Sequence, residues 1–151
     1  MIELEVILAE WDVDKEMDPT ELGEEARKIP RLHSKYLRYL MTEKMFLRQL
    51  ESVYRRLYIE KQEYYVEGAA NKKDYDYQTA KWTTLPEKGK RYVRSTVSQF
   101  LDVDVDVDAS RLNKETSQIK IEALEMIMKS IMTRGYLVSN QIDWAKWKGG
   151  N

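Results

Sequence analysis

Several residue types that carry common chemistries are missing or scarce in this chain. It has no cysteine, which excludes disulfides, thiolate catalysis, and cysteine-ligated zinc or iron–sulfur sites. His33 is the only histidine, so a serine–histidine pair of the hydrolase type is not evident. The six glycines are scattered and form no phosphate-binding loop. We therefore expect a protein that is not an enzyme and that needs no cofactor.

Long apolar runs and metal-binding patterns are also missing. No apolar run reaches the roughly 18 residues of a membrane-spanning helix, and acidic residues occupy the start of the chain, where a signal peptide needs basic and apolar ones. The aspartates from Asp104 to Asp108 imitate part of a calcium loop, but Ala109 stands where that loop needs glycine. We expect no metal, no membrane and a cytoplasmic protein.

The length favours a single domain. The chain has 151 residues, and domains typically hold about 100 to 150. Charged residues make up 34% of it, against roughly 25% in an average globular protein. We expect one highly solvated, helix-rich domain over residues 1–151, divided into an acidic segment (1–30), a long helix (31–67), a basic and aromatic connector (68–108) and C-terminal helices (109–151).

Charge is distributed unevenly along these segments. Residues 1–30 contain ten acidic and three basic side chains, whereas Arg27 to Arg56 contains nine lysines and arginines and only two glutamates. The second segment is a candidate polyanion-binding site in a protein whose formal net charge is only −1.

The stretch from Arg31 to Glu67 predicts one long helix, because it contains neither glycine nor proline. A shorter helix is expected to start near Asp18 and to end or kink at Pro30. Steps of four and three residues along the long helix give a seam of coiled-coil type, which we expect to pack mainly between subunits: Leu32, Tyr36, Tyr39, Glu43, Phe46, Leu50, Val53, Leu57, Glu60 and Tyr64.

The opposite face of the same helix is basic. Exposed charge is common on protein surfaces, but here the charge has one sign and lies on one side of a helix, which favours phosphate binding. The candidate contacts are Arg31, Lys35, Arg38, Lys44, Arg48, Arg55 and Arg56.

The rest of the chain predicts shorter elements. The connector interleaves lysines with Tyr75, Tyr77, Trp82 and Tyr92, which would either stack on bases or pack against the long helix. Alternating aspartate and valine over 102–108 indicates an extended segment. A helix is expected from Ser110 to Thr133, ended by Gly135. A last helix is expected from Asn140, and its two tryptophans, Trp144 and Trp147, would either dock it or form a patch that binds a partner protein.

Several short motifs, in a shared order and spacing, resemble the UvsY family, the recombination mediators of T-even-type phages. Ser34-Lys35-Tyr36-Leu37 resembles the family's serine-lysine-tryptophan-leucine step, and Thr133-Arg134-Gly135-Tyr136 resembles its serine-arginine-glycine-phenylalanine turn. Val105 to Ser110 is similar to its valine-aspartate-threonine-serine helix start. Further matching positions are Asp18, Thr20, Leu22, Glu25, Ala26, Lys44, Glu51, Glu63, Tyr64 and Tyr65.

The resemblance implies a non-enzymatic protein that forms a ring of six or seven subunits and binds single-stranded DNA. It implies further that the ring loads a RecA-like recombinase onto strands covered by single-strand DNA-binding protein, in the host cytoplasm. The family's lysine-alanine-arginine-leucine run, implicated in DNA binding, falls on Ile59-Glu60-Lys61-Gln62. Only Lys61 keeps a positive charge there and joins the candidate DNA contacts.

We thus expect an all-α protein with a long amphipathic helix and shorter helices, assembled into a closed helical ring that acts in DNA recombination and repair. The alternative is a helical oligomer that serves as a protein–protein interaction module and whose basic face meets an acidic protein partner. Salt-dependent binding to an oligonucleotide separates the two hypotheses.

Overall fold

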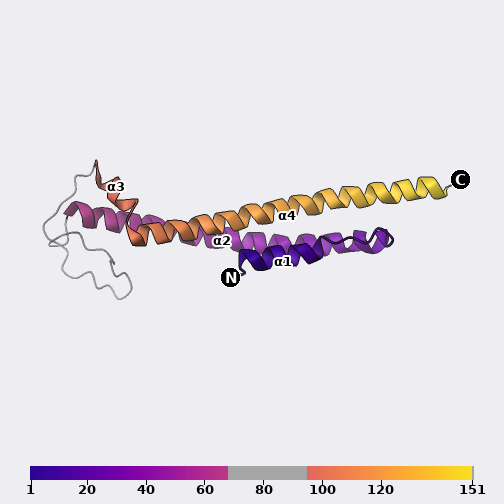
Figure 1. Ribbon diagram of the computed structural model, residues 1–151, viewed down its shortest axis with the longest axis horizontal. Coiled ribbons are helices and arrows are strands. Elements are labelled where there is room, and N and C mark those ends of the chain that lie inside the picture. Colours follow the sequence, from indigo (N-terminus) through magenta and orange to yellow (C-terminus); the bar gives the residue numbers. More distant parts are fainter. Residues whose placement is uncertain (68–94, 151) are drawn as a thin grey trace. The chain divides into compact units, whose positions relative to one another are not determined.

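The computed structural model describes residues 1–67 and 95–150, and every regular element in these ranges is an α-helix. The helices are α1 (Leu4–Asp14), α2 (Leu22–Glu67), α3 (Val97–Leu101) and α4 (Val105–Gly149) (Figure 1). The all-α prediction is therefore confirmed for the described residues. The chain forms two compact units, one of Met1–Met45 with Gln118–Asn151 and one of Phe46–Ser117.

Helix α2 contains the predicted long helix without a break. It also begins earlier than predicted, since Pro30 lies inside it instead of ending it. A proline in a helix interior removes one hydrogen bond and costs about 3 kcal/mol. Contacts on both sides of Pro30 offset that cost, because Glu25 before it and Leu32 after it are both buried. The boundary predicted between residues 30 and 31 is wrong for this reason.

The acidic N-terminal segment contains a helix that the sequence pattern did not predict. Helix α1 has only Ile7 fully buried, and it packs beside the first part of α2 (Figure 1). Trp11 meets Tyr36 edge-on, with ring centroids 5.5 Å apart. Seven of the eleven residues of α1 are apolar but they are spread around the helix, so the sequence shows no single apolar face there.

Helix α4 begins within the segment that was predicted to be extended. Asp104 caps it, because its carboxylate accepts hydrogen bonds from the backbone N–H groups of Asp106 (3.0 Å) and Val107 (3.1 Å). Val107 is buried. The alternation of aspartate and valine therefore places a cap and a core residue three positions apart, which suits a helix start.

The predicted interruption of α4 near Gly135 is also wrong. The helix continues to Gly149, and a side chain at Gly135 would meet only Ile29, at an ordinary contact distance of 4.0 Å. Buried Arg134 and Val138 hold this turn of the helix on the core of the first unit. Trp144 and Trp147 accordingly do not dock a separate helix. They are exposed and stack on each other, with ring centroids 5.0 Å apart.

The seam of α2 is largely covered by the chain's own helices at its two ends. In the first unit, the seam residues Leu32, Tyr36 and Glu43 are buried. In the second, Tyr64 and Tyr65 form a core with α3 and the start of α4, completed by Val97, Leu101 and Val107. The prediction that most of the seam packs between subunits is wrong for these ends, because partners within the same chain supply the apolar surface.

The connector lies mainly outside the described residues. Its lysines and the aromatic residues Tyr75, Tyr77, Trp82 and Tyr92 all fall between residues 68 and 94. Over 1–67 and 95–150, no helix is long and apolar enough to cross a membrane. The same ranges contain no group of three or more side chains that is suited to a metal ion.

Candidate nucleic-acid interface

Five arginines of α2 point into solvent. They are exposed, and none of them forms an ion pair with another residue of the described chain: Arg31, Arg38, Arg48, Arg55 and Arg56. Arg56 donates a hydrogen bond to the hydroxyl of Ser52 (3.1 Å). A guanidinium group without an acidic partner can bind phosphate oxygens in a bidentate manner, and Arg56 retains further N–H donors besides the one that bonds Ser52.

The position of these arginines follows from the burial of the opposite side of α2. Leu32, Tyr36 and Leu40 fix the rotation of the helix in the first unit, and Tyr64 and Tyr65 do so in the second. Because a helix advances about 100° per residue, the positions on the side opposite these anchors, where the five arginines lie, face water. The sequence pattern therefore predicts both the face and its charge.

Lys35 is placed differently from the five arginines. Its ammonium lies 2.8 Å from a carboxylate oxygen of Glu10 and 2.7 Å from one of Asp14, both on α1. The hydroxyl of Tyr36 donates a further hydrogen bond to Asp14 (2.9 Å). Partial burial would raise the pKa of Asp14, but the hydrogen bonds from Lys35 and Tyr36 outweigh it and hold this pKa below its ordinary value. Part of the acidic segment thus neutralises one predicted DNA contact.

Lys44 forms an ion pair whose two side chains are both substantially solvated. Its ammonium lies 2.7 Å from a carboxylate oxygen of Glu125, and the two side chains are 44% and 51% exposed. Exposed pairs of this kind contribute only about 0 to 1 kcal/mol. A phosphate can therefore compete for Lys44 at little cost.

Lys61 is not part of the exposed face. Its side chain is 0% exposed, and its ammonium lies 3.2 Å from Asp104 and 2.8 Å from Asp106. The hydroxyl of Tyr65 donates to the same Asp104 carboxylate (2.7 Å). Since Asp104 also caps α4, Lys61 joins the end of α2 to the start of α4 inside the second unit. This burial removes it from the phosphate contacts expected by resemblance.

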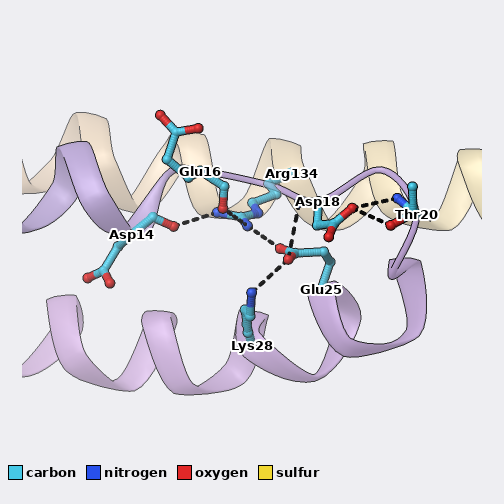
Figure 2. Close-up of polar contacts among 7 residues, drawn as sticks. All are labelled: Asp14, Glu16, Asp18, Thr20, Glu25, Lys28 and Arg134. Carbon is cyan, nitrogen blue, oxygen red and sulfur yellow. Dashed lines mark hydrogen bonds and ion pairs between the residues drawn. The ribbon is translucent and has the colours of Figure 1, made fainter.

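A buried ionic cluster holds the loop between α1 and α2. Figure 2 shows Arg134 reaching from α4 to the backbone carbonyls of Asp14 (2.8 Å) and Glu16 (3.0 Å) and to the Glu25 carboxylate (2.5 Å). Lys28 donates to Glu25 as well (2.7 Å). The hydrogen bond from Lys28 is the largest of the effects that lower the pKa of Glu25 to about 2. The cluster is structural, because it fixes α1 beside the basic helix.

A comparison with models of protein families decides which family has this architecture. The model described as the recombination, repair and ssDNA binding protein UvsY matches residues 10–151. This chain belongs to the UvsY family. The resemblance inferred from short motifs is therefore confirmed over most of the sequence, and the family is one of recombination, repair and single-stranded DNA binding.

Solved structures support the same fold. The chain is similar to crystal structures of the bacteriophage T4 recombination mediator protein UvsY in lattice types IV and II, with TM-scores of 0.79 and 0.78 at 19% identity. These matches cover 97% and 99% of this chain, and 99% of the T4 chain in both cases. A third T4 UvsY structure, lattice type I, gives a TM-score of 0.73 at 19% identity, covering 93% of this chain and 97% of the other. A search of curated proteins found no significant match.

Two methionines on the exposed side of α2 in the first unit escaped the sequence analysis. Met41 and Met45 are exposed, and helical spacing places them on the same side as Arg38. An exposed methionine gives no signal in a search for charge or for core periodicity. In this UvsY-family chain they add apolar surface next to the guanidinium groups, where the flexible thioether can follow an irregular ligand.

Proposed function

We propose that this protein is a recombination mediator that binds single-stranded DNA through the exposed arginines of α2. The observation that carries the proposal is the set of five solvent-facing arginines without acidic partners in the described residues, on one helix of a UvsY-family chain. Each phosphate that such a side chain neutralises releases condensed counterions, which favours binding without regard to base sequence. Lys35 and Lys44 are secondary contacts, because carboxylates already hold them.

The wider assembly is part of the same proposal. Subunits form a closed ring of six or seven copies, as the family resemblance implies, and the arginine face is repeated around it. Repetition raises the effective concentration of binding sites for one continuous strand, so weak contacts add up to a firm hold. The strand is wrapped or bent on the ring, and this weakens the grip of single-strand DNA-binding protein.

Recombinase loading completes the mechanism. A surface separate from the arginine face recruits a RecA-like recombinase, so that its local concentration is high where the strand has been freed. No chemical step is required of the protein. Its contribution is to bring the recombinase to a strand on which it has weakened the grip of the single-strand DNA-binding protein.

The test is the binding of a fluorescently labelled homopolymeric oligonucleotide, followed by anisotropy as salt is added. Wild-type protein is expected to bind at micromolar concentration or below and to weaken steeply with salt. The double substitution Arg48→Glu and Arg55→Glu should abolish binding and leave the mass determined by light scattering unchanged. Lys129→Glu with Lys146→Glu, two exposed lysines of α4, makes the same change in net charge and should retain binding.

The outcomes separate the proposal from its alternative. If wild-type protein binds no oligonucleotide at low salt, the basic face serves an acidic protein partner and the protein is an interaction module. If the Arg48 and Arg55 variant loses its oligomeric mass, these side chains belong to a contact between copies and not to a free face. Nucleation of recombinase filaments on covered strands, with and without wild-type protein, then tests the loading step.

A further inference from the structure

The exposed side of α2 in the first unit combines two arginines with two large apolar side chains. Met41 and Met45 are 50% and 68% exposed, and Arg31 and Arg38 are exposed as well. At about 100° per residue, Arg31, Arg38 and Met45 leave the helix within about 40° of one another, and Met41 lies about 40° from Met45. Guanidinium and thioether groups therefore follow one another along a single side of the helix.

The core of the first unit does not use these two methionines. Leu32, Tyr36 and Leu40 form the buried side of α2 there, and Met41 and Met45 lie about 140° and 180° around the helix axis from the mean direction of these three. A single exposed apolar side chain is ordinary, but two large ones that are one turn apart form a continuous apolar surface. Burial in the core therefore does not account for them.

This side of α2 carries no exposed carboxylate of its own. Between Glu25 and Glu51, the only acidic residue of the helix is Glu43. Glu43 is buried, and one of its carboxylate oxygens lies 3.1 Å from the ammonium of Lys120. The surface is therefore cationic and apolar at once, which suits a ligand that has both anionic and apolar parts.

The aromatic rings of this part of α2 are directed elsewhere. Tyr36 is buried, and the hydroxyl of Tyr39 donates a hydrogen bond to Glu10 of α1 (3.1 Å). Both rings thus lie toward α1, so neither can stack on a ligand that the arginines hold. The thioethers of Met41 and Met45 remain as the apolar groups beside the arginines, and contacts between a thioether sulfur and an aromatic ring are favourable.

We propose that Met41 and Met45 contact the bases of the single-stranded DNA whose phosphates are bound by Arg31 and Arg38. A nucleic-acid strand is the ligand because each of its nucleotides combines an anionic phosphate with a flat ring that has an apolar face. Every base has such a face, and a flexible thioether can adapt to purines and pyrimidines alike, so the contact requires no particular base sequence. The inference rests on the proposed function, since it places the bases beside the phosphate contacts.

An abasic strand separates base contacts from phosphate contacts. It has the phosphates of an ordinary oligonucleotide of the same length but no bases, so the arginines keep their ligand and the methionines lose theirs. The affinities of full-length protein for labelled oligothymidylate and for a labelled abasic strand are compared by anisotropy at the same salt concentration. Wild-type protein should bind oligothymidylate more tightly than the abasic strand.

The variant Met41→Gln with Met45→Gln removes both thioethers but keeps the charge, the approximate length and the helix propensity of the side chains. It should bind oligothymidylate about three- to tenfold more weakly than wild type, with unchanged affinity for the abasic strand. The control is Val6→Gln with Val13→Gln, which replaces two apolar side chains of α1 that are 46% and 73% exposed. It should change neither affinity.

The results that refute the base contact differ from those that refute DNA binding. If wild-type protein binds neither strand, the proposed function fails and this inference fails with it. If the methionine variant binds oligothymidylate as tightly as wild type, or weakens equally on both strands, the base contact is refuted and the phosphate contacts of the arginines stand. A lower mass of the methionine variant in light scattering would place Met41 and Met45 in a contact between copies and would also overturn the inference.

Oxidation tests the same contact without substitutions. Hydrogen peroxide transfers one oxygen atom to a methionine thioether, which gives the sulfoxide and water. Mass spectrometry of peptides should show that Met41 and Met45 oxidise more slowly with oligothymidylate bound than with the abasic strand bound. Met132 of α4, which is 59% exposed, should oxidise at the same rate with either strand. Equal rates at Met41 and Met45 with the two strands would contradict the base contact.

Discussion

Replacing Glu25 with glutamine should destabilise the protein far more than the same change at the neighbouring Glu24. Glu25 is buried and receives hydrogen bonds from Arg134 and Lys28. Glutamine keeps the size of the side chain but leaves the buried Arg134 guanidinium without a counter-charge. Glu24 pairs only with Arg27 at the surface, so its substitution removes a solvated contact.

The expected loss of stability depends on the hydrogen-bond acceptors that Arg134 retains in the Glu25→Gln variant. Removing one partner of a buried ion pair costs about 3 to 5 kcal/mol. Because the guanidinium retains the carbonyls of Asp14 and Glu16 as acceptors, we expect the lower end, about 3 kcal/mol. For a chain of this length that lowers the melting temperature by about 6 to 12 °C. Glu24→Gln should cost about 0 to 1 kcal/mol.

Urea unfolding followed by circular dichroism measures both losses. Protein concentration must be the same for all variants, because the proposed assembly would add to the apparent stability. A loss below about 1 kcal/mol for Glu25→Gln, or an equal loss for both variants, would refute the account of Arg134 as a buried group that depends on this carboxylate.

Three further predictions concern the buried charges Glu25 and Lys61 and the proline inside α2. The hydrogen bond from Lys28 is the main cause of the lowered pKa of Glu25. The ionised Glu25 carboxylate therefore stabilises the fold fully above pH 4.5, and this stabilisation is lost as the pH falls toward about 2. The urea midpoint of the wild type should fall more steeply in this window than that of Glu25→Gln. Lys61→Met should lower the free energy of unfolding by about 3 to 5 kcal/mol, because it removes the ammonium group that lies beside the buried Asp104 carboxylate, and should not change the salt dependence of oligonucleotide binding. Pro30→Ala should raise the free energy of unfolding by about 1 to 3 kcal/mol, since alanine restores a helical donor at an exposed position; an unchanged urea midpoint would contradict this.

The sequence predicted the parts of the fold that depend on local pattern. The lack of glycine and proline after Arg31 predicted an unbroken helix, and periodicity predicted which side of it carries the arginines. The same reasoning failed at Pro30 and Gly135, where local preference favours a helix end. Tertiary contacts through Leu32 and Arg134 hold the helices across these residues, and no local pattern reports them.

The candidate site shows the same limit. Lys61 was expected at the DNA surface because its position matches a basic position of the family. Its burial depends on Asp104, 43 residues later in the chain. Arg134 likewise finds Glu25, 109 residues earlier. Whether a charged side chain faces water or a buried partner is decided by such distant pairs, so the sequence predicted the charge of the site but not which charges remain free.

The central claim is that the free arginines of α2 contact the phosphates of single-stranded DNA, and the slope of log binding constant against log salt concentration measures this most directly. Each phosphate contact contributes roughly −0.7 to that slope for a single strand. Arg48→Gln with Arg55→Gln should therefore make the slope shallower by about 1.4 per bound subunit, whereas Lys129→Gln with Lys146→Gln should leave it unchanged. A wild-type slope in the Arg48 and Arg55 variant would show that the strand does not touch this face.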